Sequence, residues 1–321
     1  MKRIIVYGLG KEYETQAFLL EREYDIVAVT DKNANKADLY SNFVMPELIV
    51  ELDWDYIYVS SSRFFDEIKN ELVSKYQIGA DKIIGLQNVW WNVSNSKGRE
   101  EWIAEQLKNI PAGKKILDAG AGNQKYRVFC EHLDYVSQDF GEYDDIEKKE
   151  GLIGGQPWKS KECDIVCDIT SIPVPNYSFD YILCSEVIEH VKYPIKVISE
   201  FSRIICSGGY LLLTAPFCSL THMAPFYYYN GFSKFWYRNI LSEAGFEIVE
   251  EIPHGNYFSW MAQELIRTNY MCKKYGKKLD KDDLDSMYKS VKIFMQQSKV
   301  QKNSEDVLCF GYYIKARKGN K

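Results

Sequence analysis

Two successive runs of alternating strand-like and helix-like segments constrain the fold of this chain more than any other feature. Short apolar segments such as RIIVYG at 3–8 and YIYVSS at 56–61 alternate with helix-like segments as far as residue 88, and a second alternation begins at Lys115. Strands that alternate with helices favour parallel sheets covered by helices. The 321 residues, 46% of them hydrophobic, are enough for two domains. We therefore predict an α/β protein with two tandem Rossmann-like, doubly wound sheets.

The boundary between the two domains is expected near residue 95. Residues 89–113 combine a polar stretch with a helix-like segment, which is typical of a linker followed by a docking helix. The predicted domains are therefore residues 1–95 and residues 96–321. In the second domain a helix is expected over 187–205, and a helical insertion from about 259 to 302 precedes the last strand. The strands expected there are KILDAG, YVSQD, DIVCDI, DYILCSE, GYLLLTAP, FEIVEEI and VLCFGYYIKA.

Composition excludes several classes of function. A net charge of −5 does not supply the basic face that binding to nucleic acid requires. The sequence has no uninterrupted apolar stretch of the length that spans a bilayer. The eight cysteines are scattered without a C-x-x-C pair, so we expect buried thiols and no metal site. The expectation is a cytoplasmic protein without a nucleic-acid partner or a transmembrane segment.

The turn within KKILDAGAGNQKY, residues 114–126, is the expected ligand site. In open α/β sheets, ligands bind outside the carboxyl ends of the strands. Gly120 and Gly122 let the backbone approach a ligand, and Asp118 places a carboxylate at the strand end. A dinucleotide fingerprint needs a third glycine for its pyrophosphate, but Asn123 and Gln124 follow here. The turn therefore favours a ligand with cationic character and no phosphate.

Acidic residues at the ends of the next strands define the rest of this ligand. Asp139 follows the acid of the turn at about the 20-residue offset typical of an acid that binds ribose hydroxyls. Asp168 can accept a hydrogen bond from an adenine amino group, and Ile169 can cover the ring. Ser185 and Glu186 end the fourth strand and face the reacting end of the cleft. A phosphate-free adenosine attached to a cationic group is S-adenosylmethionine, which is the expected cofactor.

These segments resemble the motifs of class I S-adenosylmethionine-dependent methyltransferases of the type 11-like kind. The resemblance is carried by ILDAGAGN, SQDF, CDITSIPVPNYSFDYILCSEVIEHV and RIICSGGYLLLTAPF, in this order, over residues 114–252 and plausibly the final strand at 307–316. It implies a methyltransferase with a seven-stranded sheet and a helical insertion before the last strand. The cofactor contacts that it implies are Asp118, Ala119, Gly120, Gly122, Asp139, Phe140, Asp168, Ile169, Ser185 and Glu186.

Residues 221–265 resemble a narrower subgroup that is associated with bacterial surface-glycan and polysaccharide gene clusters. This resemblance implies a small-molecule or glycan acceptor, with a sugar hydroxyl as the first expectation. Aromatic side chains with polar rims suit stacking on sugar rings. The expected acceptor contacts are Phe226, Tyr228, Tyr229 and His222.

A hydroxyl acceptor must lose a proton, and a nearby imidazole can take it. His222 lies in the loop after the fifth strand, at the expected mouth of the cleft, and His254 follows the sixth strand. His190 follows the fourth strand, where a structural role in holding the next helix is the alternative. These three histidines are the candidates for the general base.

The first domain carries a degraded dinucleotide fingerprint. VYGLGKEYE supplies Gly8 and Gly10, but Tyr13 stands where the third glycine belongs, while Asp31 keeps the ribose-type acid. The domain resembles Rossmann-like modules found beside enzymes of glycan assembly. Binding of a nucleotide-linked sugar and a docking scaffold both remain open, as does a homodimer.

Two other functions remain as alternatives. A tandem NAD-dependent oxidoreductase would need at least one intact glycine triplet, and neither turn has one. A non-catalytic methyltransferase fold used as a binding subunit would be expected to lack the cofactor acids. Asp118, Asp139, Asp168 and Glu186 are all present.

Overall fold

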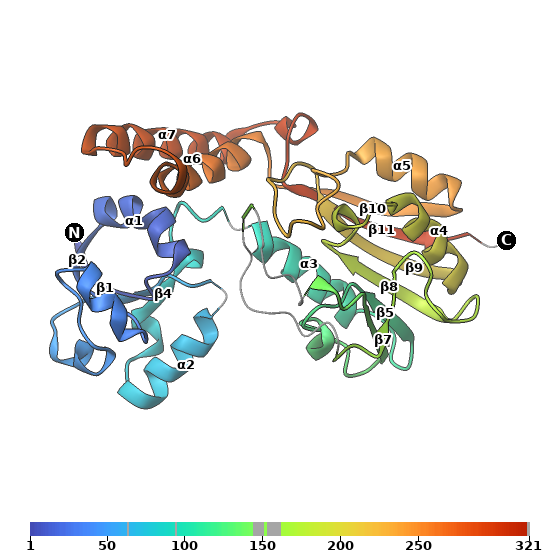
Figure 1. Cartoon of the computed structure of the whole chain (residues 1–321), viewed down its shortest axis with the longest axis horizontal. Helices are drawn as coiled ribbons and strands as arrows, with labels where there is room; N and C mark the ends of the chain where they lie inside the picture. Colours follow the sequence, from blue (N-terminus) through green and yellow to red (C-terminus); the bar gives the residue numbers. More distant parts are fainter. Residues whose placement is uncertain (63, 94, 144–150, 153–161, 320–321) are drawn as a thin grey trace. The chain divides into compact units, whose positions relative to one another are not determined.

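The computed structural model describes residues 1–62, 64–93, 95–143, 151–152 and 162–319, which form two compact units (Figure 1). Unit 1 consists of Met1–Ser94 and Phe258–Lys302, and unit 2 of Asn95–Tyr257 and Asn303–Lys321. The first division between the units falls beside the predicted boundary at residue 95. Residues 258–302, which we expected within the second domain, fold with unit 1.

Unit 1 is built on a four-stranded parallel sheet in the order β2-β1-β3-β4. Alternate residues of its central strand face opposite sides of the sheet. Ile4 and Val6 pack on the side of α1 (Lys11–Glu23), whereas Ile5 and Tyr7 pack on the side of α2 (Phe65–Tyr76). Its use as a Rossmann-type nucleotide site stays a prediction. The strands are β1 (Lys2–Tyr7), β2 (Tyr24–Thr30), β3 (Tyr56–Val59) and β4 (Ile83–Gly85).

The insertion is a pair of helices that completes the α1 side of unit 1. These helices are α6 (Tyr257–Tyr275) and α7 (Lys281–Val300). Ala262 and Ile266 of α6 and Val291 and Met295 of α7 are buried in one cluster with the residues of α1. The apolar stripe of the insertion is therefore part of the core of unit 1.

Unit 2 contains a seven-stranded sheet in the order β10-β11-β9-β8-β5-β6-β7. β11 runs antiparallel to both of its neighbours, β10 and β9, and the other pairs of the sheet are parallel. The predicted seven-stranded sheet is thus confirmed, although only Ile165–Val166 of the segment DIVCDI form a strand and the last strand begins at Gly311. The strands are β5 (Lys115–Ala119), β6 (Asp134–Asp139), β7 (Ile165–Val166), β8 (Phe179–Ser185), β9 (Ile205–Pro216), β10 (Phe246–His254) and β11 (Gly311–Lys318).

Helices cover both faces of this sheet. On one face, α4 (Pro194–Ile204) and α5 (Lys234–Glu243) pack over Leu117 of β5 and Leu213 of β9. On the other face, α3 (Asn95–Lys108) packs over Ile116 and Leu183. The helix expected over 187–205 begins only at Pro194. Proline has no backbone N–H, so it cannot donate the hydrogen bond that would continue a helix from the preceding turn. Residues 186–193 therefore form a loop with one short 3₁₀ helix, η8 (Ile188–His190), at the carboxyl end of β8, where a ligand of such a sheet binds.

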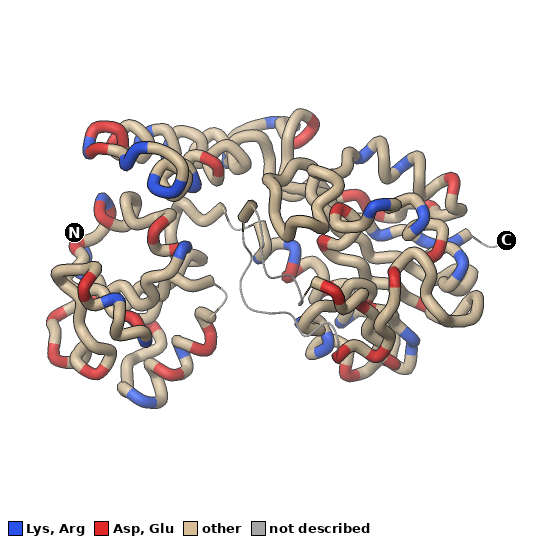
Figure 2. Tube along the Cα trace, viewed as in Figure 1, with Lys and Arg blue, Asp and Glu red and all other residues tan. Residues whose placement is uncertain are grey.

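Basic and acidic residues are interspersed over both units (Figure 2). Among the helices of the described ranges, none combines the length and the apolar character needed to cross a membrane.

Candidate active site at the carboxyl ends of the strands

The glycine turn after β5 is tied to the end of β6. Gly120 has φ +76°, and a Cβ built on it would lie 2.3 Å from a methyl group of Val187, so a side chain does not fit there. The backbone N–H of Gly120 donates to the Gln138 carbonyl (2.8 Å), and that of Gly122 donates to Asp139 Oδ2 (3.0 Å). This hydrogen bonding brings the turn and the predicted ribose acid side by side.

The Asp139 carboxylate is held at the strand end by backbone donors. It is 3% exposed, and its Oδ1 accepts the N–H of Phe140 (2.8 Å). A carboxylate oxygen accepts more than one hydrogen bond, so ribose hydroxyls can add to these donors. Binding of the ribose by Asp139 and of the cofactor by the glycine turn stays a prediction.

Asp118 has a partner within the sheet. The Tyr135 hydroxyl of β6 donates to Asp118 Oδ2 over 2.6 Å, and Asp118 is 3% exposed. Burial raises the pKa of Asp118 to about 6; the charge of Asp139 acts in the same direction, and the hydrogen bond from Tyr135 acts against it. A direct contact of Asp118 with a cationic ligand stays a prediction.

The raised pKa of Asp118 gives a testable pH dependence of stability. An exposed aspartate has a pKa of about 3.9, so the folded chain binds this proton more tightly than the unfolded chain does. This contribution favours the fold below about pH 4 and declines as the pH rises toward 6. We expect Asp118→Asn to remove the decline, as measured by urea unfolding of the ligand-free protein at about pH 4.5 and pH 7. Identical pH dependence in the wild type and the variant would contradict this expectation.

The predicted adenine residues lie after β7. Asp168 is exposed, and its Oδ1 accepts hydrogen bonds from the N–H (2.8 Å) and the hydroxyl (2.7 Å) of Thr170. Ile169 is buried in the core of unit 2, as is Ala119 at the end of β5. Adenine contacts from this segment stay a prediction.

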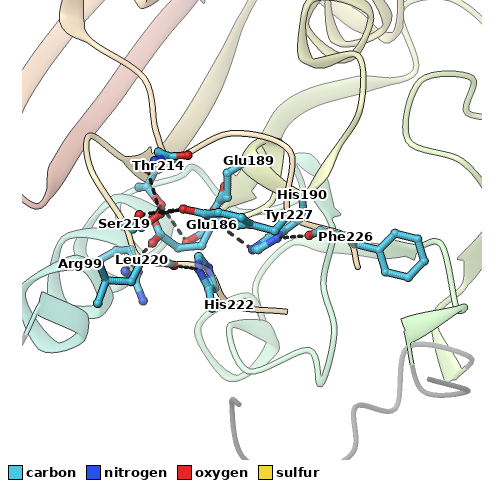
Figure 3. A network of polar contacts seen from close by, with 12 residues as sticks. Arg99, Glu186, Glu189, His190, Thr214, Ser219, Leu220, His222, Phe226 and Tyr227 are labelled. Atoms are coloured by element: carbon cyan, nitrogen blue, oxygen red, sulfur yellow. Dashed lines mark hydrogen bonds and ion pairs between the residues drawn. The ribbon is translucent and has the colours of Figure 1, made fainter. Parts of the chain in front are cut away.

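Glu186, directly after β8, forms an ion pair that the sequence did not reveal. Its Oε2 lies 2.9 Å from a guanidinium nitrogen of Arg99 on α3, and its Oε1 accepts from the Thr214 hydroxyl (3.1 Å; Figure 3). Although burial would lower the pKa of Arg99, the charge of Glu186 raises it above the usual value. The Ser185 hydroxyl lies 2.9 Å from that of Thr214. Both predicted residues of the inner wall are thus fixed by side chains of neighbouring elements.

Next to this ion pair, Glu189, His190 and His222 form a group that we call the acid-histidine cluster. One donor atom from each of the three residues lies within 4.8 Å of the others. The two imidazole rings are 4.7 Å apart, and His190 Nε2 is 3.6 Å from Glu189 Oε1 (Figure 3). Burial, followed by the neighbouring His222, lowers the pKa of His190 to about 4, so its ring is neutral at pH 7. The structure therefore joins two of the three histidines proposed as bases.

Glu189 is the most enclosed member of the cluster. It is 0% exposed, and neither of its carboxylate oxygens has a hydrogen-bond partner among the described residues. Burial raises its pKa well above the usual value; Glu186 adds to this effect and Arg99 opposes it. Glu189 was missed as a site residue, although the spacing of Glu186, Glu189 and His190 along the sequence was a usable signal.

The loop that carries the predicted acceptor contacts is attached to this cluster. The backbone N–H groups of Tyr228 and Tyr229 donate to the Glu189 carbonyl (3.1 and 3.2 Å), and these tyrosines are 46% and 37% exposed. The Phe226 ring packs edge-on against Phe140 at 5.0 Å. A predicted acceptor contact and a predicted cofactor contact therefore touch each other.

His254 lies apart from the cluster. Its ring stacks on Tyr313 at 5.0 Å, and burial, followed by the charge of Arg99, lowers its pKa to about 4. Its role as a base stays a prediction.

Two family models match the chain in succession. Residues 96–251 match a model described as a methyltransferase domain. The match covers most of unit 2, so this unit is similar to methyltransferase domains. The cofactor is S-adenosylmethionine, as the sequence predicted, and solved structures that align with the chain name the same cofactor. Residues 1–84 match a second model, described as C2185-like, N-terminal.

The similarity to curated proteins agrees with the methyltransferase domain. A sarcosine/dimethylglycine N-methyltransferase of Aphanothece halophytica is 28% identical over 185 residues, which cover 51% of this chain and 64% of that protein. A ubiquinone biosynthesis O-methyltransferase of Xanthomonas axonopodis pv. citri (strain 306) is 25% identical over 153 residues, or 43% of this chain and 61% of that protein. The chain thus spans less than two thirds of the length of either relative.

Solved structures of methyltransferases also align with the chain. An S-adenosylmethionine-dependent methyltransferase from Archaeoglobus fulgidus aligns over 70% of this chain and 93% of its own length, at 16% identity and a TM-score of 0.43.

Proposed function

We propose that this protein transfers a methyl group from S-adenosylmethionine to a hydroxyl oxygen of a small-molecule or glycan acceptor. A sugar hydroxyl in surface-polysaccharide biosynthesis is the acceptor that we favour. The observation that carries the proposal is the acid-histidine cluster, which collects two ring nitrogens and a buried carboxylate at the carboxyl end of β8. A hydroxyl acceptor must lose its proton on methylation, and the cluster lies where we expect this acceptor to bind.

The cofactor would be held by the turn after β5 and by the acids that follow the next strands. Gly120 and Gly122 allow close approach of its methionine portion, Asp139 would bind the ribose, and Asp168 would accept from the adenine. When bound, S-adenosylmethionine supplies an electrophilic methyl group, which the acceptor oxygen receives while the sulfur retains the bonding electron pair. The Glu186–Arg99 ion pair would fix the wall of the cleft, because the Glu186 carboxylate is held by Arg99 on one oxygen and by Thr214 on the other.

The cluster favours oxygen over nitrogen as the acceptor atom. The two curated relatives are an N-methyltransferase and an O-methyltransferase by name, so their similarity does not decide between these atoms. A neutral amine nitrogen is nucleophilic without losing a proton, whereas a hydroxyl oxygen becomes a good nucleophile only as its proton is removed. The exposed rings of Tyr228 and Tyr229 offer faces on which a sugar ring can stack.

Titration calorimetry on the full chain tests the proposal. We expect S-adenosylhomocysteine to bind and NAD not to bind. With S-adenosylmethionine and a panel of sugar nucleotides, free sugars and amines including sarcosine, we expect mass spectrometry to show a methyl group on oxygen of a sugar-containing acceptor. Binding of NAD alone would favour the oxidoreductase, and binding of neither compound would favour the non-catalytic subunit.

For unit 1 we propose a scaffold function in place of a nucleotide site. The Asp31 carboxylate accepts from the Leu9 N–H (2.7 Å) and from Lys36 Nζ (2.7 Å). Although burial would raise the pKa of Asp31, these hydrogen bonds hold it below its usual value. Because the ammonium group of Lys36 already pairs with this carboxylate, we do not favour a ribose there. Binding of a nucleotide-linked sugar is the alternative, and titration with uridine diphosphate glucose would reveal a site of this kind.

A further inference from the structure

We propose that the acid-histidine cluster binds one divalent first-row transition metal ion, with zinc as the reference ion. The ligands are the Glu189 carboxylate, His190 Nε2 and His222 Nε2. They come from the short 3₁₀ helix after β8 and from the loop after β9. We expected no metal site, because the cysteines form no C-x-x-C pair. The residues of the cluster come from two separate segments, which only the fold brings together.

Both imidazoles are already oriented as metal ligands. His190 Nδ1 lies 2.6 Å from the Phe226 carbonyl oxygen, and His222 Nδ1 lies 2.8 Å from the Leu220 carbonyl oxygen (Figure 3). A carbonyl oxygen only accepts, so Nδ1 carries the hydrogen and Nε2 of the neutral ring carries the lone pair. A hydrogen bond from the other ring nitrogen is the usual support of a metal-bound histidine.

The Glu189 carboxylate provides a second, independent observation. It is 0% exposed, and both of its oxygens lack a hydrogen-bond partner among the described residues. A carboxyl group buried without a hydrogen-bond partner is costly to a fold in either protonation state, because neither water nor a protein group replaces its hydration. A cation bound between Glu189 and the two Nε2 atoms would remove that cost. The nearby carboxylate of Glu186 is already paired with Arg99, so we do not count it as a ligand.

The donor set selects the class of ion. Two imidazole nitrogens and one carboxylate form a set typical of zinc sites that keep a coordination position open. Magnesium and calcium prefer sites made of oxygen ligands. The three donor atoms lie within 4.8 Å of one another. Zinc–ligand distances of about 2.0–2.2 Å therefore require only small side-chain movements.

The role of the ion rests on the proposed function. A metal ion lowers the pKa of a hydroxyl that coordinates it. The acceptor O–H bond would then break with transfer of its proton to solvent water, and the oxygen would keep the electron pair for attack. In this scheme neither histidine acts as the general base, because both Nε2 lone pairs bind the metal.

Metal binding by the full-length protein tests the site without an activity assay. The protein is stripped with a chelator, titrated with zinc or magnesium, desalted and measured for metal content by mass spectrometry. We expect one tightly bound zinc per chain and much weaker binding of magnesium. Glu189→Gln and His222→Asn should each weaken zinc binding by more than about 100-fold, because each removes a direct ligand. His132→Gln is the matched control, since His132 bonds the Ile110 carbonyl in another part of unit 2.

Three results would overturn the metal site. These are wild-type protein that binds no stoichiometric zinc, equal zinc binding by the wild type and both cluster variants, and magnesium binding as tight as that of zinc. Circular dichroism checks the fold of each variant. If the buried Glu189→Gln variant does not fold, the more accessible His222→Asn variant decides. Zinc binding without binding of S-adenosylhomocysteine would contradict the proposed function and leave the metal site standing, so the two failures are distinguishable.

Discussion

Replacing Asp139 by asparagine is expected to weaken binding of S-adenosylhomocysteine by about 10- to 100-fold. The proposed ribose hydroxyls donate to a charged carboxylate, and hydrogen bonds to charged groups contribute about 1.5–3 kcal/mol. Asparagine has nearly the same shape, so the turn that Gly122 forms against this side chain retains one acceptor. Titration calorimetry of the purified variant measures the change.

Asp134 provides the control for this experiment. It begins the same strand, at the opposite end from Asp139, and its side chain is 62% exposed. Asp134→Asn should therefore leave the affinity unchanged. Equal affinities of the wild type and Asp139→Asn would show that the ribose is not bound at this carboxylate.

Replacing Met295 by alanine is expected to lower the free energy of opening of unit 1 by about 2–5 kcal/mol, the usual cost of such a cavity in a core. Met295 lies on α7 but is buried with residues of α1 and β1. Hydrogen exchange followed by mass spectrometry suits this prediction, because it reports the opening of each unit by its own peptides.

The same helix supplies a control for the cavity. Ile293 is 57% exposed, so Ile293→Ala should change the free energy of opening by less than about 0.5 kcal/mol. We expect Met295→Ala to increase exchange in the peptides of β1 and α1. Increased exchange confined to α6 and α7 would contradict the placement of the hairpin in this core.

The sheet of unit 2 was predictable because its strands carry their own signal. KILDAG and GYLLLTAP are apolar segments bounded by turn residues, and such segments form buried strands wherever helices cover both faces. The turn at Gly120 was also predictable, because glycines directly after a strand indicate a tight turn. In the structure Gly120 has a positive φ and no room for a side chain.

Contacts between side chains from distant segments were not predictable. Arg99 belongs to a helix that the sequence marks only as a docking element, and nothing in its neighbourhood indicates a partnership with Glu186. The Tyr135 hydroxyl is aimed at Asp118 by the pairing of β5 with β6, which is a property of the register. The helical insertion is a similar case. Its apolar stripe predicts that the helices are buried on one side, but it does not indicate in which of the two units.

The acid-histidine cluster was predictable only in part. Glu189 and His190 are adjacent in the sequence and follow a predicted strand, so half of the cluster was visible. The fold supplies His222 from a loop beyond the next strand, and it supplies the carbonyl oxygens that orient both rings.

The order in which the chain enters the two units has a consequence for its synthesis on the ribosome. Unit 1 acquires its last helices only when residues 258–302 have emerged, and β11, which lies between β9 and β10, follows them. Unit 1 therefore cannot finish folding before residues 258–302 are translated, and unit 2 cannot finish folding before β11 is translated. Nascent chains that stall before residue 303 would expose the unpaired edges of β9 and β10, which makes them targets for chaperones.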